Sequence, residues 1–130
     1  MNKLEILKDD IKRAIYNCFY SKIAELKYKP TRRSTFIISQ ILDMREDIFS
    51  VIDNIEVKFN EISLKLLKKL IDETIFSYEC HRRFCSCNRI GDHLNDVELL
   101  NIRNEIFEII EKFSDRLIRK TYLGGGDHNV

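Results

Sequence analysis

The chain contains very few residues that would interrupt a helix. It has one proline, Pro30, and four glycines, three of which are adjacent at positions 124–126. Proline and glycine are the strongest local breakers of regular helices. Over most of the remaining length, apolar side chains recur at steps of three to five residues, which is the spacing of one helix face. The sequence therefore predicts an all-α fold built from long amphipathic helices.

The first two predicted helices lie on either side of Pro30. We expect the first over residues 3–28, because proline disfavours helical geometry in the residue before it. The second follows a cap at Thr31 or Ser34, since a hydroxyl at that position accepts a hydrogen bond from a free amide of the first turn. Its apolar pattern reaches about Asp53, and it is wide enough to pack against two neighbouring helices.

Residues 54–60 are open to two interpretations. In the first, the chain turns here and Asn60 caps a third helix that reaches about residue 80. In the second, one continuous helix runs from about residue 35 to 80. Helices of that length are uncommon in compact domains. The sequence therefore favours a turn and two separate helices.

The fourth predicted helix follows a capping box at Asn95 and Glu98, in which the glutamate accepts a hydrogen bond from the amide of the capping residue. We expect this helix to continue to about residue 122 and to end at Gly124 in left-handed geometry. The chain then divides into a single domain over 1–122 and a flexible C-terminal tail over 123–130.

Four amphipathic segments joined by short connections predict an antiparallel up-down-up-down four-helix bundle, with a Cys/His-rich connection between its third and fourth helices. The length of 130 residues is enough for one domain with its own core. Apolar residues make up 44% of the chain and charged residues 33%, which fits helices that each have one buried and one solvated face.

The N-terminus carries charged residues from Lys3 onward and lacks the apolar run of a signal peptide. No uninterrupted apolar stretch approaches the roughly 18 residues that a membrane-spanning helix needs. We therefore expect a cytoplasmic protein without a membrane partner. Thiols are kept reduced in that compartment, so clustered cysteines there are more often metal ligands or free thiols than disulfides.

Three of the four cysteines and two of the three histidines fall between positions 80 and 93. Zinc favours four nitrogen or sulfur ligands in a tetrahedron, and Cys80, Cys85, Cys87 and His93 form such a set. These residues predict a structural zinc site that ties the third helix to the fourth. The one-residue gap between the second and third of these cysteines departs from common zinc motifs, so reduced free thiols, reactive thiols or a disulfide stay as alternatives. Cys18 is interpreted as a small buried filler on the first helix.

Basic residues gather in the first and third connections, although the formal net charge is only +1. Helices that alternate in direction would bring these two connections to the same end of the bundle. Arginine favours planar contact with phosphate or carboxylate, and Tyr28 and Phe84 are available to stack on bases. We therefore predict an anion- or nucleic-acid-binding end formed by Lys27, Lys29, Arg32, Arg33, Arg82, Arg83 and Arg89. The simpler alternative is that these are solvated loop charges.

The sequence lacks the motifs of several enzyme classes. It has no Glu-x-x-His, His-Glu-x-x-His or Gly-x-Ser-x-Gly pattern and no phosphate-binding Walker loop. This favours a non-enzymatic regulatory or adaptor module whose partner is nucleic acid first and an acidic protein surface second. The competing hypothesis is a protein-interaction module or homodimer without metal or nucleic acid. Its interface would be the wide apolar faces of the second and fourth helices.

Overall fold

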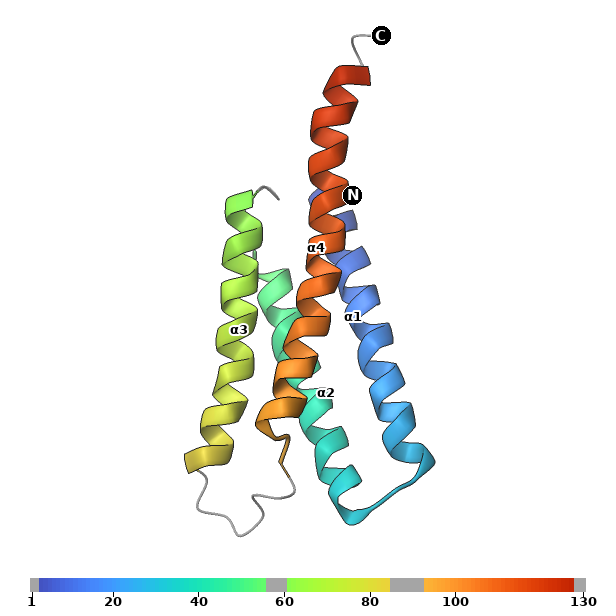
Figure 1. Cartoon of the computed structure of the whole chain (residues 1–130), viewed down its shortest axis with the longest axis vertical. Coiled ribbons are helices and arrows are strands. Elements are labelled where there is room, and N and C mark those ends of the chain that lie inside the picture. The colour runs from blue at the N-terminus through green and yellow to red at the C-terminus, as the bar shows by residue number, and fades with distance from the viewer. Residues whose placement is uncertain (1–2, 56–60, 85–92, 128–130) are drawn as a thin grey trace.

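The computed structural model describes residues 3–55, 61–84 and 93–127. These residues form the four helices α1 (Lys3–Tyr28), α2 (Arg32–Asp53), α3 (Glu61–Phe84) and α4 (Asp96–Asp127), with no strand among them (Figure 1). Helix α1 packs against α2 and α4, and α3 packs against the same two helices. The prediction of an all-α, four-helix fold is confirmed.

The connection between α1 and α2 forms as the local sequence dictates. Helix α1 ends at Tyr28, as Pro30 requires, and α2 begins at Arg32. Of the two predicted capping residues, Thr31 is the cap, and its hydroxyl accepts a hydrogen bond from the Ser34 amide at 3.1 Å. The Ser34 hydroxyl in turn accepts one from the Thr31 amide at 3.0 Å. This capping box fixes the point at which the chain enters α2.

Helices α2 and α3 are separate. Helix α2 ends at Asp53, and the amide of Asn54 donates to the carbonyl of Ser50 at 3.0 Å. Helix α3 begins at Glu61, so the alternative of one continuous helix from 35 to 80 is wrong. The cap predicted at Asn60 lies outside the described residues.

The other two helices are longer than predicted. Helix α3 continues through Phe84, so Cys80 lies one turn before its end rather than at its end. Helix α4 continues to Asp127, three residues beyond the predicted end at Gly124, and none of its glycines has a positive φ. Glycine destabilises a helix by about 1 kcal/mol relative to alanine but is compatible with helical angles. The division into a domain over 1–122 and a tail over 123–130 stays a prediction.

The core lies along the axis of the bundle and consists mostly of isoleucine. One stripe of apolar side chains on α2 is buried, and it comprises Ile37, Ile41, Met44, Ile48 and Ile52. Leu94 also joins the core, although it lies outside any helix. Leu94 immediately precedes the capping residue Asn95, and Leu99 follows that cap by four residues and is also buried. These are the two positions of a hydrophobic staple. This staple sets the angle at which the chain enters α4.

Side chains on α1 and α2 meet in reverse order. The Lys12 ammonium lies 5.9 Å from the centre of the Phe49 ring, and the Arg45 guanidinium lies 4.9 Å from the centre of the Tyr16 ring. Lys12 also forms an ion pair with Asp53 at 2.8 Å. A later residue of α1 therefore faces an earlier residue of α2, which makes this pair antiparallel.

Helices α3 and α4 are antiparallel by the same argument. Lys68 pairs with Glu111 at 2.9 Å, and Asp72 pairs with Arg103 at 2.6 Å. Figure 1 shows the α1–α2 connection, the end of α3 and the start of α4 at one end of the molecule. None of the helices in the described ranges combines the length and apolar character needed to cross a bilayer.

Candidate functional site

The described residues of the predicted site lie at the end of the molecule that holds the α1–α2 connection, the last turn of α3 and the first turn of α4 (Figure 1). We call this the basic end. Lys27, Lys29 and Arg32 are exposed here, and none forms a hydrogen bond or ion pair within the part of the chain that the structure describes. Tyr28 is 83% exposed. Cationic and aromatic groups therefore face solvent together.

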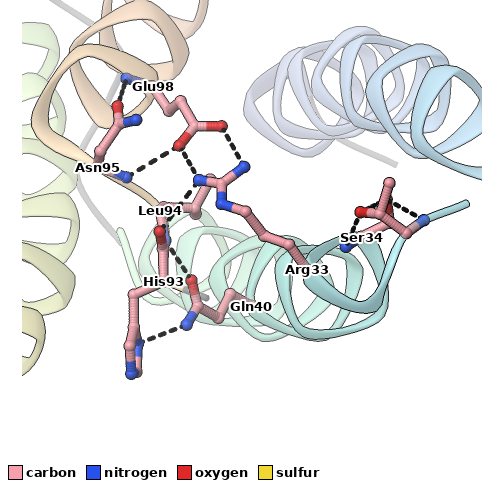
Figure 2. A network of polar contacts seen from close by, with 8 residues as sticks. Arg33, Ser34, Gln40, His93, Leu94, Asn95 and Glu98 are labelled. Atoms are coloured by element: carbon pink, nitrogen blue, oxygen red, sulfur yellow. Dashed lines mark hydrogen bonds and ion pairs between the residues drawn. The ribbon is translucent and has the colours of Figure 1, made fainter. Parts of the chain in front are cut away.

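Arg33 is positioned differently from these three. Its guanidinium reaches across from α2 and bonds both carboxylate oxygens of Glu98 in the first turn of α4, with Nη1 to Oε2 at 3.3 Å and Nη2 to Oε1 (Figure 2). Nη2 also donates to the carbonyl of His93 at 3.2 Å. Arg33, predicted as an anion contact, thus joins the start of α2 to the start of α4.

Gln40 makes a second link two turns further along α2. Its Oε1 accepts the amide of Leu94 at 2.8 Å, and its Nε2 lies 2.6 Å from Nδ1 of His93 (Figure 2). Because Oε1 is the acceptor for Leu94, Nε2 is the donor and Nδ1 of His93 the acceptor. One amide side chain therefore fixes both the backbone and the ring orientation of the segment before α4.

The predicted capping box at the start of α4 is confirmed. Asn95 Oδ1 accepts the Glu98 amide at 2.8 Å, and Glu98 Oε1 accepts the Asn95 amide at 3.0 Å. The carboxylate of Glu98 therefore has two roles, since the same oxygen that caps α4 also pairs with Arg33. Capping residues can be read from sequence spacing, whereas the pairing with Arg33 cannot.

The predicted zinc ligands are described only in part. Cys80 is a partly buried free thiol on α3, and His93 is held beside Gln40. Cys85, Cys87 and Arg89 lie outside the described residues. The backbone of Arg82 and Arg83 belongs to the last turn of α3. Among the residues that are described, no three His, Cys, Asp or Glu side chains are grouped so as to hold a metal ion.

A cavity of about 410 Å³ lies between α2, α3 and the segment before α4, and the sequence did not predict it. It is lined by Gln40, Asp43, Asp47, Ser77, Tyr78, His93 and Leu94. The Tyr78 hydroxyl donates to Asp47 at 2.7 Å. Burial first, and then this hydrogen bond and the two aspartate charges, raise the pKa of Tyr78 above its ordinary value. The cavity is thus acidic, in contrast to the basic end beside it.

Cys18 is more than a filler. Its Sγ donates to Glu105 Oε2 at 2.9 Å, and Lys22 pairs with Glu105 Oε1 at 3.0 Å, which links α1 to α4. Burial, followed by the hydrogen bond and the charge of Glu105, raises the pKa of the Cys18 thiol to about 12. The thiol therefore stays protonated at neutral pH, and a protonated thiol is a poor nucleophile.

Replacing Gln40 should destabilise the protein, because Gln40→Ala leaves the amide of Leu94 without its acceptor beside a buried side chain. An unsatisfied backbone donor in such a position costs about 1–3 kcal/mol. Urea unfolding should show a loss of this size. The exposed neighbour Ser39 provides the control, and Ser39→Ala should stay within about 0.5 kcal/mol of wild type. Equal stability of the two variants would contradict this role of Gln40.

Comparison with known proteins does not assign this arrangement. No protein-family model, curated protein or solved structure matches the chain. A function for the basic end must therefore be argued from the chemistry of its own residues.

Proposed function

We propose that the chain is a non-enzymatic regulatory or adaptor module whose basic end binds an anionic partner, with nucleic acid favoured over an acidic protein surface. The helices would follow an up-down-up-down order, which the antiparallel pairs α1/α2 and α3/α4 support. The cytoplasm is its predicted compartment.

The observation that carries this proposal is the state of Lys27, Lys29 and Arg32. All three are exposed, and within the described ranges no carboxylate pairs with them. Elsewhere on the bundle several cations are engaged, as Lys22 is by Glu105 and Arg103 by Asp72. Unpaired surface cations are the groups that neutralise backbone phosphates and release their counterions.

The last turn of α3 adds to this charge. Arg82 and Arg83 belong to it, and it lies at the same end of the molecule as the α1–α2 connection (Figure 1). The exposed ring of Tyr28 lies between two of the cations in sequence and is available to stack on an unpaired base. Stacking together with backbone charge is typical of proteins that bind single strands. Single-stranded nucleic acid is therefore the partner that this surface fits best.

The proposal is tested by removing these three exposed cations together. Lys27→Ala/Lys29→Ala/Arg32→Ala leaves Arg33 and its structural contacts in place. The matched control is Lys65→Ala/Lys69→Ala/Lys112→Ala, which removes three exposed lysines from α3 and α4 away from the basic end. Fluorescence anisotropy with a labelled single-stranded oligonucleotide measures affinity across a salt series.

We expect the basic-end variant to bind at least about tenfold more weakly than wild type, because it loses three phosphate contacts. The dependence of log K on log salt should flatten by about 2, at roughly 0.7 per contact for single strands. The control variant should change much less in both respects. Equal losses in the two variants, or no oligonucleotide binding by wild type at low salt, would contradict the nucleic-acid proposal. In the second case an acidic protein surface becomes the first partner to test.

We further propose that the basic end is ordered by a structural zinc ion held by Cys80, Cys85, Cys87 and His93. The donor types suit zinc. Support comes from the free thiol of Cys80 near the end of α3 and from the position of His93 just before α4. Because Gln40 donates to Nδ1 of this ring, His93 would bind zinc only after that hydrogen bond is released. A bound zinc would supply a cross-link between these two helices.

Elemental analysis of protein purified without added metal tests the zinc proposal. We expect about one zinc per chain in wild type and a large loss in Cys80→Ser, because a structural site needs all four ligands. Cys18→Ser is the control and should keep its zinc, since Cys18 bonds to Glu105 instead. A wild-type protein free of zinc would exclude the site.

A second candidate function, self-association or protein interaction through apolar helix faces, has its own supporting observation. The central stripe of α2 is buried in the core, but Leu42 at its edge is 36% exposed, and Phe76, Val97 and Leu100 are 59%, 67% and 52% exposed. The Asp72–Arg103 pair brings Phe76 and Leu100 to a similar level on adjacent helices. Dimerisation that is insensitive to salt and unchanged in the basic-end variant would favour this candidate.

A further inference from the structure

We infer that Glu98 is an autoinhibitory carboxylate, which occupies Arg33 in place of a phosphate of the partner and so limits how tightly the basic end binds. This inference rests on the proposed function, because it concerns the regulation of that same surface. Among the described residues, Arg33 is the member of the predicted basic set that forms an ion pair with a carboxylate.

The geometry of the pair is that of phosphate recognition. Two guanidinium nitrogens of Arg33 face two oxygens of Glu98 (Figure 2). Arginine binds phosphate in the same planar, two-pronged manner. A phosphate and the Glu98 carboxylate therefore compete for the same N–H groups, and the partner can engage Arg33 only when Glu98 moves away.

Arg33 is accessible to such a competitor. Its side chain is 37% exposed and that of Glu98 is 33% exposed, so the pair lies at the surface rather than in the core. Arg32 precedes it in the chain and is also exposed. A strand held by Lys27, Lys29 and Arg32 would thus lie at the same end of the molecule as Arg33 (Figure 1).

Displacement of Glu98 need not detach α4 from the bundle. The link from Gln40 to the amide of Leu94 does not involve Arg33. Leu94 and Leu99 remain buried in the core on either side of the cap. The Arg33–Glu98 pair can therefore open locally while the first turn of α4 stays in place.

The test uses Glu98→Gln, which removes the competing charge and keeps the cap. Glutamine serves at this position of a capping box as glutamate does, so the hydrogen bond with the Asn95 amide is retained. The control is Glu25→Gln, because Glu25 is exposed and lines the same hollow of about 170 Å³ as Glu98. It removes the same charge close by without a contact to Arg33. Arg33→Ala/Glu98→Gln asks whether any gain depends on the arginine.

We expect Glu98→Gln to bind the single-stranded oligonucleotide about five- to tenfold more tightly than wild type, with the salt dependence steeper by about 0.7 because one more phosphate is contacted. Glu25→Gln should change affinity by less than about twofold, since a lone surface charge is screened. The double variant should lose the gain of Glu98→Gln.

The outcomes separate this inference from the proposed function. If wild type binds and the basic-end variant does not, but Glu98→Gln equals wild type in affinity and salt dependence, the inference is wrong and the function stands. A gain that persists in Arg33→Ala/Glu98→Gln, or that Glu25→Gln matches, also overturns it, because the effect is then general electrostatics. If wild type and Glu98→Gln both fail to bind, the function and the inference fall together.

Discussion

The paired contact between Arg33 and Glu98 is the interaction on which the basic end depends. The two residues are 65 positions apart in the chain, and their contact fixes the start of α4 against the start of α2. The same guanidinium also holds the carbonyl of His93, and Gln40 holds the next amide. These polar contacts surround the cap at Asn95, and the apolar residues on either side of the cap, Leu94 and Leu99, are buried in the core. Packing and hydrogen bonding therefore favour the same placement of α4.

This arrangement gives Arg33 two conflicting uses. As a structural residue, Arg33 forms an ion pair with Glu98. The charge of Glu98 reduces the repulsion between Arg33 and the cations Arg32, Lys27 and Lys29. As a binding residue, Arg33 would have to leave that carboxylate. Sites that bind strongly charged partners commonly sacrifice stability, because like charges must be kept together without a partner present. An internal carboxylate that is displaced on binding moderates this conflict, since the charge is compensated in the free protein.

The sequence predicted most of the fold because the relevant signals are local. Pro30 and Thr31 set the first connection, the spacing of Asn95 and Glu98 set the start of α4, and apolar periodicity predicted amphipathic helices with one buried face. The end of α4 was missed because glycine only weakens a helix, and the observed helix passes through residues 124–126 without left-handed geometry.

The site was less predictable, because its key contacts join residues far apart in the chain. Periodicity shows that Arg33, Gln40 and Glu98 are near helix starts or on polar faces, but not which of them meet. Arg33 was therefore grouped with Lys27 and Lys29 as an anion-binding residue, and its pairing with Glu98 was not foreseen. In the same way, the bond from Cys18 to Glu105 spans 87 positions, and no local pattern indicates it. The sequence located the charges, and the contacts of Arg33 and Gln40 with the start of α4 determine which of them are available.

The most direct test of this account is a double-mutant cycle on the free energy of unfolding, with Arg33→Ala, Glu98→Gln and the double variant compared with wild type by urea denaturation. Residues in one ion-paired network couple by about 0.5–3 kcal/mol. We predict a coupling free energy within this range that decreases as salt is raised, because both side chains are partly exposed. Additive effects, with a coupling within about 0.3 kcal/mol of zero at low salt, would show that Arg33 and Glu98 do not hold the two helices together and would contradict the account.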